Sequence, residues 1–146
     1  MAGIWTKTEG LDELVKAFYK LGSEAVPFMT KGINEAGEVV LAKARQKAPI
    51  GKMSGHSGTL KKGIERYKIK FVKNQPFSMS SLIGLSEDVQ YGVSVELGHQ
   101  IIRNGKSVGI AKAKPFLRPA ADESREEVIK IMSNALDKAL DELGGQ

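Results

Sequence analysis

Apolar residues of this chain repeat at helix spacing near both ends and at strand spacing in the middle. This change of period constrains the fold strongly, because a helix repeats its faces every 3.6 residues and a strand alternates them. From Leu11 the pattern predicts a helix with Thr8 as N-cap and Gly22 as its stop. A second helix is predicted from Pro27, which a first turn tolerates, to Lys47. The apolar positions are Leu11, Leu14, Val15, Phe18 and Leu21, then Val26, Met29, Ile33, Ala36, Val40 and Ala44.

Two glycines, Gly32 and Gly37, interrupt the second helical pattern. They either weaken this helix or mark a place where another backbone comes close. Residues 49–58 then combine three glycines, two serines and a proline, which predicts a mobile loop. Residues 59–64 are expected to form a short helical turn that leads into a sheet.

Strand signals follow this turn. In residues 66–71 aromatic and apolar side chains alternate with cations, as in a half-buried strand. Residues 77–85 predict a second strand, and residues 89–97 a third with Tyr91, Val93, Val95 and Leu97 on one side. Asn104-Gly105 is a strong tight-turn signal and predicts a hairpin between Ile101-Ile102 and Val108–Ile110.

After Pro119 a last helix is predicted. Its apolar face consists of Val128, Ile131, Met132, Ala135, Leu136, Ala139 and Leu143. Helices, then strands, then a helix predict an α+β fold: N-terminal helices, a central antiparallel sheet of three to five strands, and a C-terminal helix packed on the sheet. With 146 residues and no internal repeat or linker, residues 1–146 are expected to form one domain.

The net charge of +5 is spread unevenly. Residues 43–73 carry ten cations and one anion, whereas residues 122–146 carry seven carboxylates and three cations, which gives +9 against −4. This asymmetry favours either a polyanion at the middle segment or head-to-tail contact between copies. The alternative is that both segments are solvated faces.

Composition also limits the chemistry that this chain can perform. It has no cysteine, which excludes disulfides and thiolate sites and suits a reducing cytoplasm. We expect neither a signal peptide nor a membrane-spanning segment, because no apolar run approaches about 20 residues. Gly51-Lys52 lacks the glycine and the Ser/Thr of a phosphate loop. His56 and His99 lie far from each other and from acids at ligand spacing. No catalytic residue, cofactor or metal is therefore predicted.

Four short pieces stand in a distinctive order. They are Ala48-Pro49, Gly58-Thr59-Leu60-Lys61-Lys62-Gly63-Ile64, Tyr91-Gly92-Val93-Ser94-Val95-Glu96-Leu97-Gly98 and Pro115-Phe116-Leu117-Arg118-Pro119-Ala120. With this spacing, from about Gly10 to Leu143, the chain resembles the tail-completion (neck) proteins of long-tailed bacteriophages, also called minor tail components. Departures from the family pattern include Lys61 for arginine, Gly92 for alanine, Leu97 for phenylalanine and His99 for threonine, and Thr59 follows the loop glycine instead of preceding it.

The resemblance implies a structural, non-enzymatic subunit of the virus particle. It would form a ring, expected to be six-fold, between the head connector and the tail tube or terminator, with the genome crossing its lumen. Under this hypothesis the candidate DNA-facing cations are Lys52, Lys61, Lys62, Arg66, Lys68 and Lys70. The candidate subunit-interface residues are Glu96, Phe116, Leu117 and Arg118.

These assignments have alternatives. Phe116 and Leu117 equally fit this domain's own core, and Glu96 could pair with Arg118 at a corner, a contact that contributes at most about 1 kcal/mol if exposed. The alternative function is that of a small basic protein that binds nucleic acid non-specifically. The alternation of Arg66, Lys68 and Lys70 suits phosphate contact, whereas the aromatics fall on the opposite face, unlike a base-stacking platform.

Overall fold

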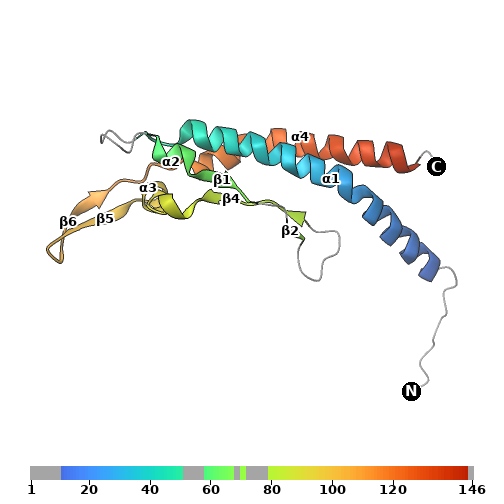
Figure 1. The fold of residues 1–146 in the computed structure, drawn as a ribbon, viewed down its shortest axis with the longest axis horizontal. Coiled ribbons are helices and arrows are strands. Elements are labelled where there is room, and N and C mark those ends of the chain that lie inside the picture. The colour runs from blue at the N-terminus through green and yellow to red at the C-terminus, as the bar shows by residue number, and fades with distance from the viewer. Residues whose placement is uncertain (1–10, 51–57, 68–69, 72–78, 145–146) are drawn as a thin grey trace, which may run out of the picture.

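A computed structural model describes residues 11–50, 58–67, 70–71 and 79–144. Two long helices dominate it: α1 (Leu11–Lys47) and α4 (Leu117–Gly144). Figure 1 shows the two helices running side by side, with the strands below them in this view. The molecule is therefore mixed α and β, as predicted, with the helices in the larger share.

Helix α1 is continuous where two helices were predicted. Neither Gly22 nor Pro27 ends it. The Lys20 ammonium lies 3.8 Å from the Glu24 carboxylate across Gly22. Proline removes one backbone hydrogen bond and commonly bends a helix. Figure 1 shows the N-terminal part of α1 sloping away from α4. The predicted end at Lys47 is confirmed.

Helices α1 and α4 pack closely at Gly32. A Cβ atom at this position would lie 2.7 Å from the Ala135 Cβ, closer than real side chains approach. Gly32 thus marks the close contact that was one of its two predicted roles. Ala36, Ala135 and Ala139 are buried along the same contact. Of the predicted apolar face of α4, Leu136 is an exception, because 46% of it is exposed.

The strands form three separate antiparallel pairs. β1 (Ile64–Arg66) pairs with β4 (Ile83–Leu85), β2 (Lys70–Phe71) with β3 (Met79–Ser80), and β5 (His99–Arg103) with β6 (Lys106–Ala111). The predicted central sheet of three to five strands is therefore wrong. The strand predicted over 66–71 is divided between β1 and β2, and no third strand joins β1 and β4 in the described residues.

The strand predicted over 89–97 is also wrong. This segment forms a 3-10 helix (η1, Glu87–Val89) and a short helix, α3 (Gly92–Leu97). The inward-facing positions of this segment lie three residues apart, at Val89, Gly92 and Val95, whereas Leu97 is exposed. A Cβ at Gly92 would meet the Leu60 side chain at 2.6 Å. Packing against Leu60 therefore favours the helical spacing over the alternation.

The hairpin and the short helical turn are confirmed. Asn104 (φ 48°) and Gly105 (φ 73°) both have left-handed backbones, as a two-residue hairpin turn requires. The turn before β1 is helix α2 (Thr59–Lys62). The last helix begins at Leu117, before Pro119 rather than after it as predicted. The predicted mobile loop falls mostly on residues 51–57, which lie outside the described residues.

The core is small and lies at one end of α1. It comprises Leu41, Ala44, Ala48, Leu60, Ile64, Val89, Phe116 and Ala120. Among the described residues, the largest fully buried side chains are Phe116, Ile64, Val89 and Ser124. Helix α4 packs chiefly on α1, and it is α1 that contacts β1 and β4. The prediction that the C-terminal helix packs on the sheet is thus wrong. No helix in the described ranges is long and apolar enough to cross a membrane.

Candidate functional site

The corner between α3 and α4 is held by the Glu96 carboxylate. Its Oε2 accepts hydrogen bonds from the backbone N–H of Phe116 (2.6 Å) and of Leu117 (3.0 Å). Its Oε1 accepts from the N–H of Arg118 at 3.0 Å. A carboxylate at a helix N-terminus is favourable because the first N–H groups lack partners and carry partial positive charge. Glu96, from another element, therefore caps α4.

Every backbone N–H group in the first turn of α4 has a hydrogen-bond acceptor. Leu117 and Arg118 donate to Glu96. Pro119 has no N–H to satisfy. The Ala120 N–H donates to the Phe116 carbonyl at 3.3 Å. Each of the first four helical positions is thus satisfied without a Ser, Thr, Asp or Asn cap in the preceding sequence.

Two opposing effects set the pKa of Glu96. Partial burial raises the pKa of this carboxyl group, since desolvation disfavours the charged form. The three backbone donors and the positive charge of Arg118 lower it, and together they outweigh burial, so the pKa of Glu96 lies below its ordinary value. The predicted ion pair between Glu96 and Arg118 does not form within 4.0 Å. The carboxylate binds the backbone N–H of Arg118, and the guanidinium acts only through its charge.

Backbone contacts close the same corner. The Lys114 N–H donates to the Val95 carbonyl at 2.8 Å. Gly98 ends α3 with a φ of 76°, and a Cβ there would lie 2.8 Å from the Ala111 carbonyl oxygen. A side chain at Gly98 would therefore both strain the backbone and separate α3 from the segment before α4.

All four motif pieces of the sequence meet at this end of the molecule. Ala48, Leu60, Phe116 and Ala120 are buried together, and Val95 packs against them. Phe116 is fully buried in this chain's own core, and Leu117 is half-buried against it. Packing and capping within one chain thus account for the buried residues of the pieces and for Glu96, whereas Tyr91, Val93 and Leu97 are exposed. Of the four candidate interface residues, Arg118 alone is exposed, whereas Glu96 and Leu117 are half-buried and Phe116 is buried.

The structure describes the side chains of three of the six candidate DNA-facing cations, and these three differ in exposure and in hydrogen bonding. Lys61 and Lys62 are exposed at the end of α2. Arg66 is half-buried, and it donates to the Glu38 carboxylate (2.9 Å) and the Asn34 side-chain oxygen (2.8 Å). Lys52, Lys68 and the side chain of Lys70 lie outside the described part of the chain.

Other cations of the basic segment are paired with the acidic C-terminal segment. Lys43 lies 3.1 Å from the Glu127 carboxylate, and Lys47 lies 2.6 Å from that of Glu123. Arg45 donates twice to the Ile64 carbonyl, at 2.8 and 3.1 Å. Part of the charge asymmetry is therefore neutralised between α1 and α4 of one chain, an outcome that the sequence interpretation did not include.

The β5–β6 hairpin exposes an apolar surface that the sequence analysis did not select. Ile102, Val108 and Ile110 are 64%, 58% and 74% exposed. Figure 1 shows the hairpin projecting from the end of the molecule where α4 begins. The signal was present in the sequence: Ile101 and Ile102 are adjacent, so a two-stranded hairpin must turn one of them away from any core.

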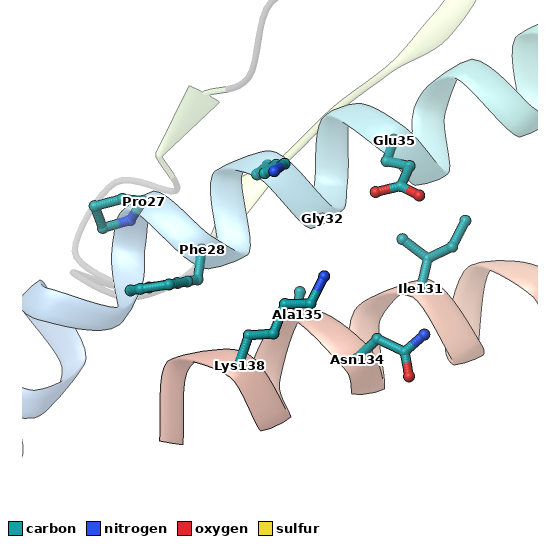
Figure 2. A pocket seen from close by; sticks show the side chains of 9 residues that line it. Pro27, Phe28, Gly32, Glu35, Ile131, Asn134, Ala135 and Lys138 are labelled. Atoms are coloured by element: carbon teal, nitrogen blue, oxygen red, sulfur yellow. The ribbon is translucent and has the colours of Figure 1, made fainter. Parts of the chain in front are cut away.

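Two open grooves flank the helices. One, of about 340 Å³, lies between α1 and α4, and Figure 2 shows Glu35 of α1 and Ile131 of α4 pointing toward one another across it. Its charged side chains, Lys31, Glu35 and Lys138, are exposed and of both signs, as on an ordinary helix surface. The other, of about 530 Å³, lies beside the corner and includes Glu96 and Arg118.

Histidine and carboxylate groups form no cluster of three that could hold a metal ion in the described ranges. His99 is exposed, with its Nδ1 at 3.4 Å from the Ser94 carbonyl oxygen. His56 lies outside those ranges. Comparison of the chain with protein-family models, with characterised proteins and with solved structures finds no match.

Proposed function

We propose that this chain is a structural subunit of the neck of a long-tailed bacteriophage, where copies of it form a ring at the head-proximal end of the tail. The observation that carries the proposal is the projecting β5–β6 hairpin, whose branched apolar side chains lie outside a small core. Exposed apolar surface of this kind is typical of sites that another protein covers. A subunit of a permanent assembly has such surfaces because its neighbours bury them.

The α3–α4 corner supports the same proposal. The resemblance to neck proteins rests on four short pieces of sequence, and these pieces pack against one another around Phe116 and Glu96. Sequence segments that together build one packed corner are expected to occur together in all proteins of a family that shares this fold. The corner also fixes the base of the hairpin, through Gly98 and the Lys114 N–H.

Basic side chains supply the proposed contact with the genome. Lys61 and Lys62 are the described candidates that remain exposed and without a partner in the described chain, so they are assigned to the lumen of the ring. Arg66 is assigned to folding instead, because its guanidinium is held by Glu38 and Asn34. Contact with DNA would be transient and independent of sequence, since ammonium groups attract any phosphate backbone.

The test is to mix the purified protein with purified phage tails that lack their neck and to examine them by electron microscopy. Rings at the tail ends, with a countable symmetry, are the expected result. Light scattering of the protein alone gives its mass before assembly. A protein that ignores tails but binds duplex DNA with an affinity that falls steeply with salt is instead a nucleic-acid-binding protein, and the neck proposal is then wrong.

A further inference from the structure

The β5–β6 hairpin carries one apolar face. Ile110 of β6 pairs with Gln100 of β5, so the two side chains lie on the same face of the hairpin. Ile102 also lies on this face, because it follows Gln100 by two residues on β5. The register shifts between Ile101 and Ile102, and Val108 is the extra residue opposite this shift. These branched side chains are largely exposed, and nothing else in the described chain covers them.

Helix α4 carries a second apolar surface on its outer side. Ile129, Leu136 and Leu140 lie at i, i+7 and i+11, which places them on one helix face, and they are 56%, 46% and 49% exposed. We call these three residues the α4 stripe. Ala135 and Ala139, which are buried in the contact with α1, each precede a stripe residue and therefore lie about 100° around the helix from the α4 stripe.

The surroundings of the two surfaces have opposite charge. Residues 99–114 contain four cations (Arg103, Lys106, Lys112 and Lys114) and no carboxylate. Residues 122–144 contain seven carboxylates and three cations, and Glu123 and Glu127 are paired with α1. Glu126 and Asp137 lie three residues before Ile129 and Leu140, so these two carboxylates, which are unpaired within the described residues, border the α4 stripe together with one cation, Arg125, four residues before Ile129.

One chain cannot bring its own two surfaces together. The hairpin projects from the end of the molecule where α4 begins, whereas α4 runs to the opposite end (Figure 1), and Leu136 and Leu140 belong to the C-terminal half of α4. A second copy of the chain satisfies both the apolar and the charge requirement. From this placement we infer that the basic, apolar hairpin of one copy docks on the acidic-bordered α4 stripe of the next copy.

This contact deepens the proposed function, which requires contacts between copies, and it specifies their kind. It joins different surfaces of the two partners and is therefore head-to-tail. Such a contact leaves one free hairpin and one free stripe at the ends of any open assembly, so copies add until the rotation closes a ring. A two-fold contact, in contrast, would stop at a dimer.

The experiment uses three variants of the full chain with the same replacement: Ile110→Glu in the hairpin, Leu140→Glu in the α4 stripe, and Leu82→Glu as a control. Leu82 is 67% exposed on the turn between β3 and β4, away from both surfaces. Sedimentation equilibrium measures self-association up to about 1 mM protein, which corresponds to weak specific binding. Circular dichroism melts confirm that each variant is folded.

Wild-type protein and Leu82→Glu are expected to self-associate, and Ile110→Glu and Leu140→Glu to do so at least about tenfold more weakly. An equimolar mixture of the last two retains one intact hairpin and one intact stripe. It should therefore form 1:1 dimers and nothing larger. Wild-type protein that stays monomeric, or a mixture that does not dimerise, overturns the inference.

Tail binding separates this inference from the proposed function. If wild-type rings decorate tails and both weakened variants do so equally well, the neck proposal stands and the hairpin-to-stripe contact is wrong. If the contact forms as described but no assembly binds tails, the contact stands and the neck proposal is wrong.

Discussion

Replacing Glu96 with alanine is expected to destabilise the fold by about 2 kcal/mol. The change removes the acceptor of three backbone donors, at 2.6, 3.0 and 3.0 Å. A hydrogen bond to a charged group contributes about 1.5–3 kcal/mol, and loss of a helix cap costs about 0.5–2 kcal/mol. The value of about 2 kcal/mol lies where the two ranges overlap, and the three hydrogen bonds are not summed, because Glu96 is only half-buried and water can reach some of the exposed donors. For a chain of this length the melting temperature should fall by about 6 °C.

The pH dependence distinguishes a charged cap from simple packing. Because the folded-state pKa of Glu96 lies below its ordinary value of 4.5, its stabilisation is fully present above that value and is lost as pH falls through the folded pKa. The penalty for Glu96→Ala should therefore be largest near neutral pH and shrink in acid. Glu96→Gln keeps one acceptor oxygen but no charge, and it should cost about 1 kcal/mol near neutral pH.

Urea unfolding followed by circular dichroism, at about pH 7 and at about pH 3, measures both effects. The matched control is Glu87→Ala, which removes an exposed carboxylate of η1 and should change stability by less than about 0.5 kcal/mol. If Glu96→Ala is as stable as this control near neutral pH, Glu96 does not cap α4 in the way argued. A penalty that does not shrink in acid would show that packing, rather than charge, is lost.

Three further predictions concern the helix contact and the charged surfaces. Gly32→Ala should destabilise the protein by about 1–2 kcal/mol in urea unfolding although alanine favours helix, because its methyl would overlap Ala135; the double change with Ala135→Gly should recover most of the loss. Lys47→Ala should cost no more than about 1 kcal/mol, and less in high salt, because its ion pair is partly exposed. Lys61→Glu with Lys62→Glu should leave thermal stability nearly unchanged but reduce DNA retention in particles assembled with the protein; unchanged retention contradicts their assignment to the lumen.

The sequence predicted correctly those elements whose conformation depends on residues adjacent in the chain. The hairpin follows from Asn104-Gly105, since few other residue pairs accept two successive left-handed backbones. The end of α1 follows from the loss of helical pattern before Pro49. The strand predicted over 89–97 failed because the segment holds two patterns at once. Its alternating apolar residues suggest a strand, and only contact with Leu60, distant in sequence, selects the helical alternative at Gly92.

Capping at the corner was foreseeable only in part. Glu96 and Arg118 were expected to pair through their side chains, whereas the carboxylate binds backbone N–H groups. The sequence before α4, Lys114-Pro115-Phe116, has none of the usual N-cap residues, so the helix needed an acceptor from elsewhere. That requirement could have been read from the sequence. The identity of the acceptor could not, because it depends on α3 ending beside the start of α4.

Charge asymmetry gives the clearest case of what a sequence leaves undecided. The excess of cations over 43–73 and of acids over 122–146 suggested a polyanion or head-to-tail contact. In the structure the C-terminal end of α1 lies beside the start of α4, so Lys43 and Lys47 meet Glu127 and Glu123 within one chain. Charges that are paired this way cannot attract a partner. The relevant quantity is therefore the charge left after internal pairing. In the described residues this includes the cations on and after the hairpin and the unpaired carboxylates of α4, beside the two surfaces whose exposed apolar side chains also need cover.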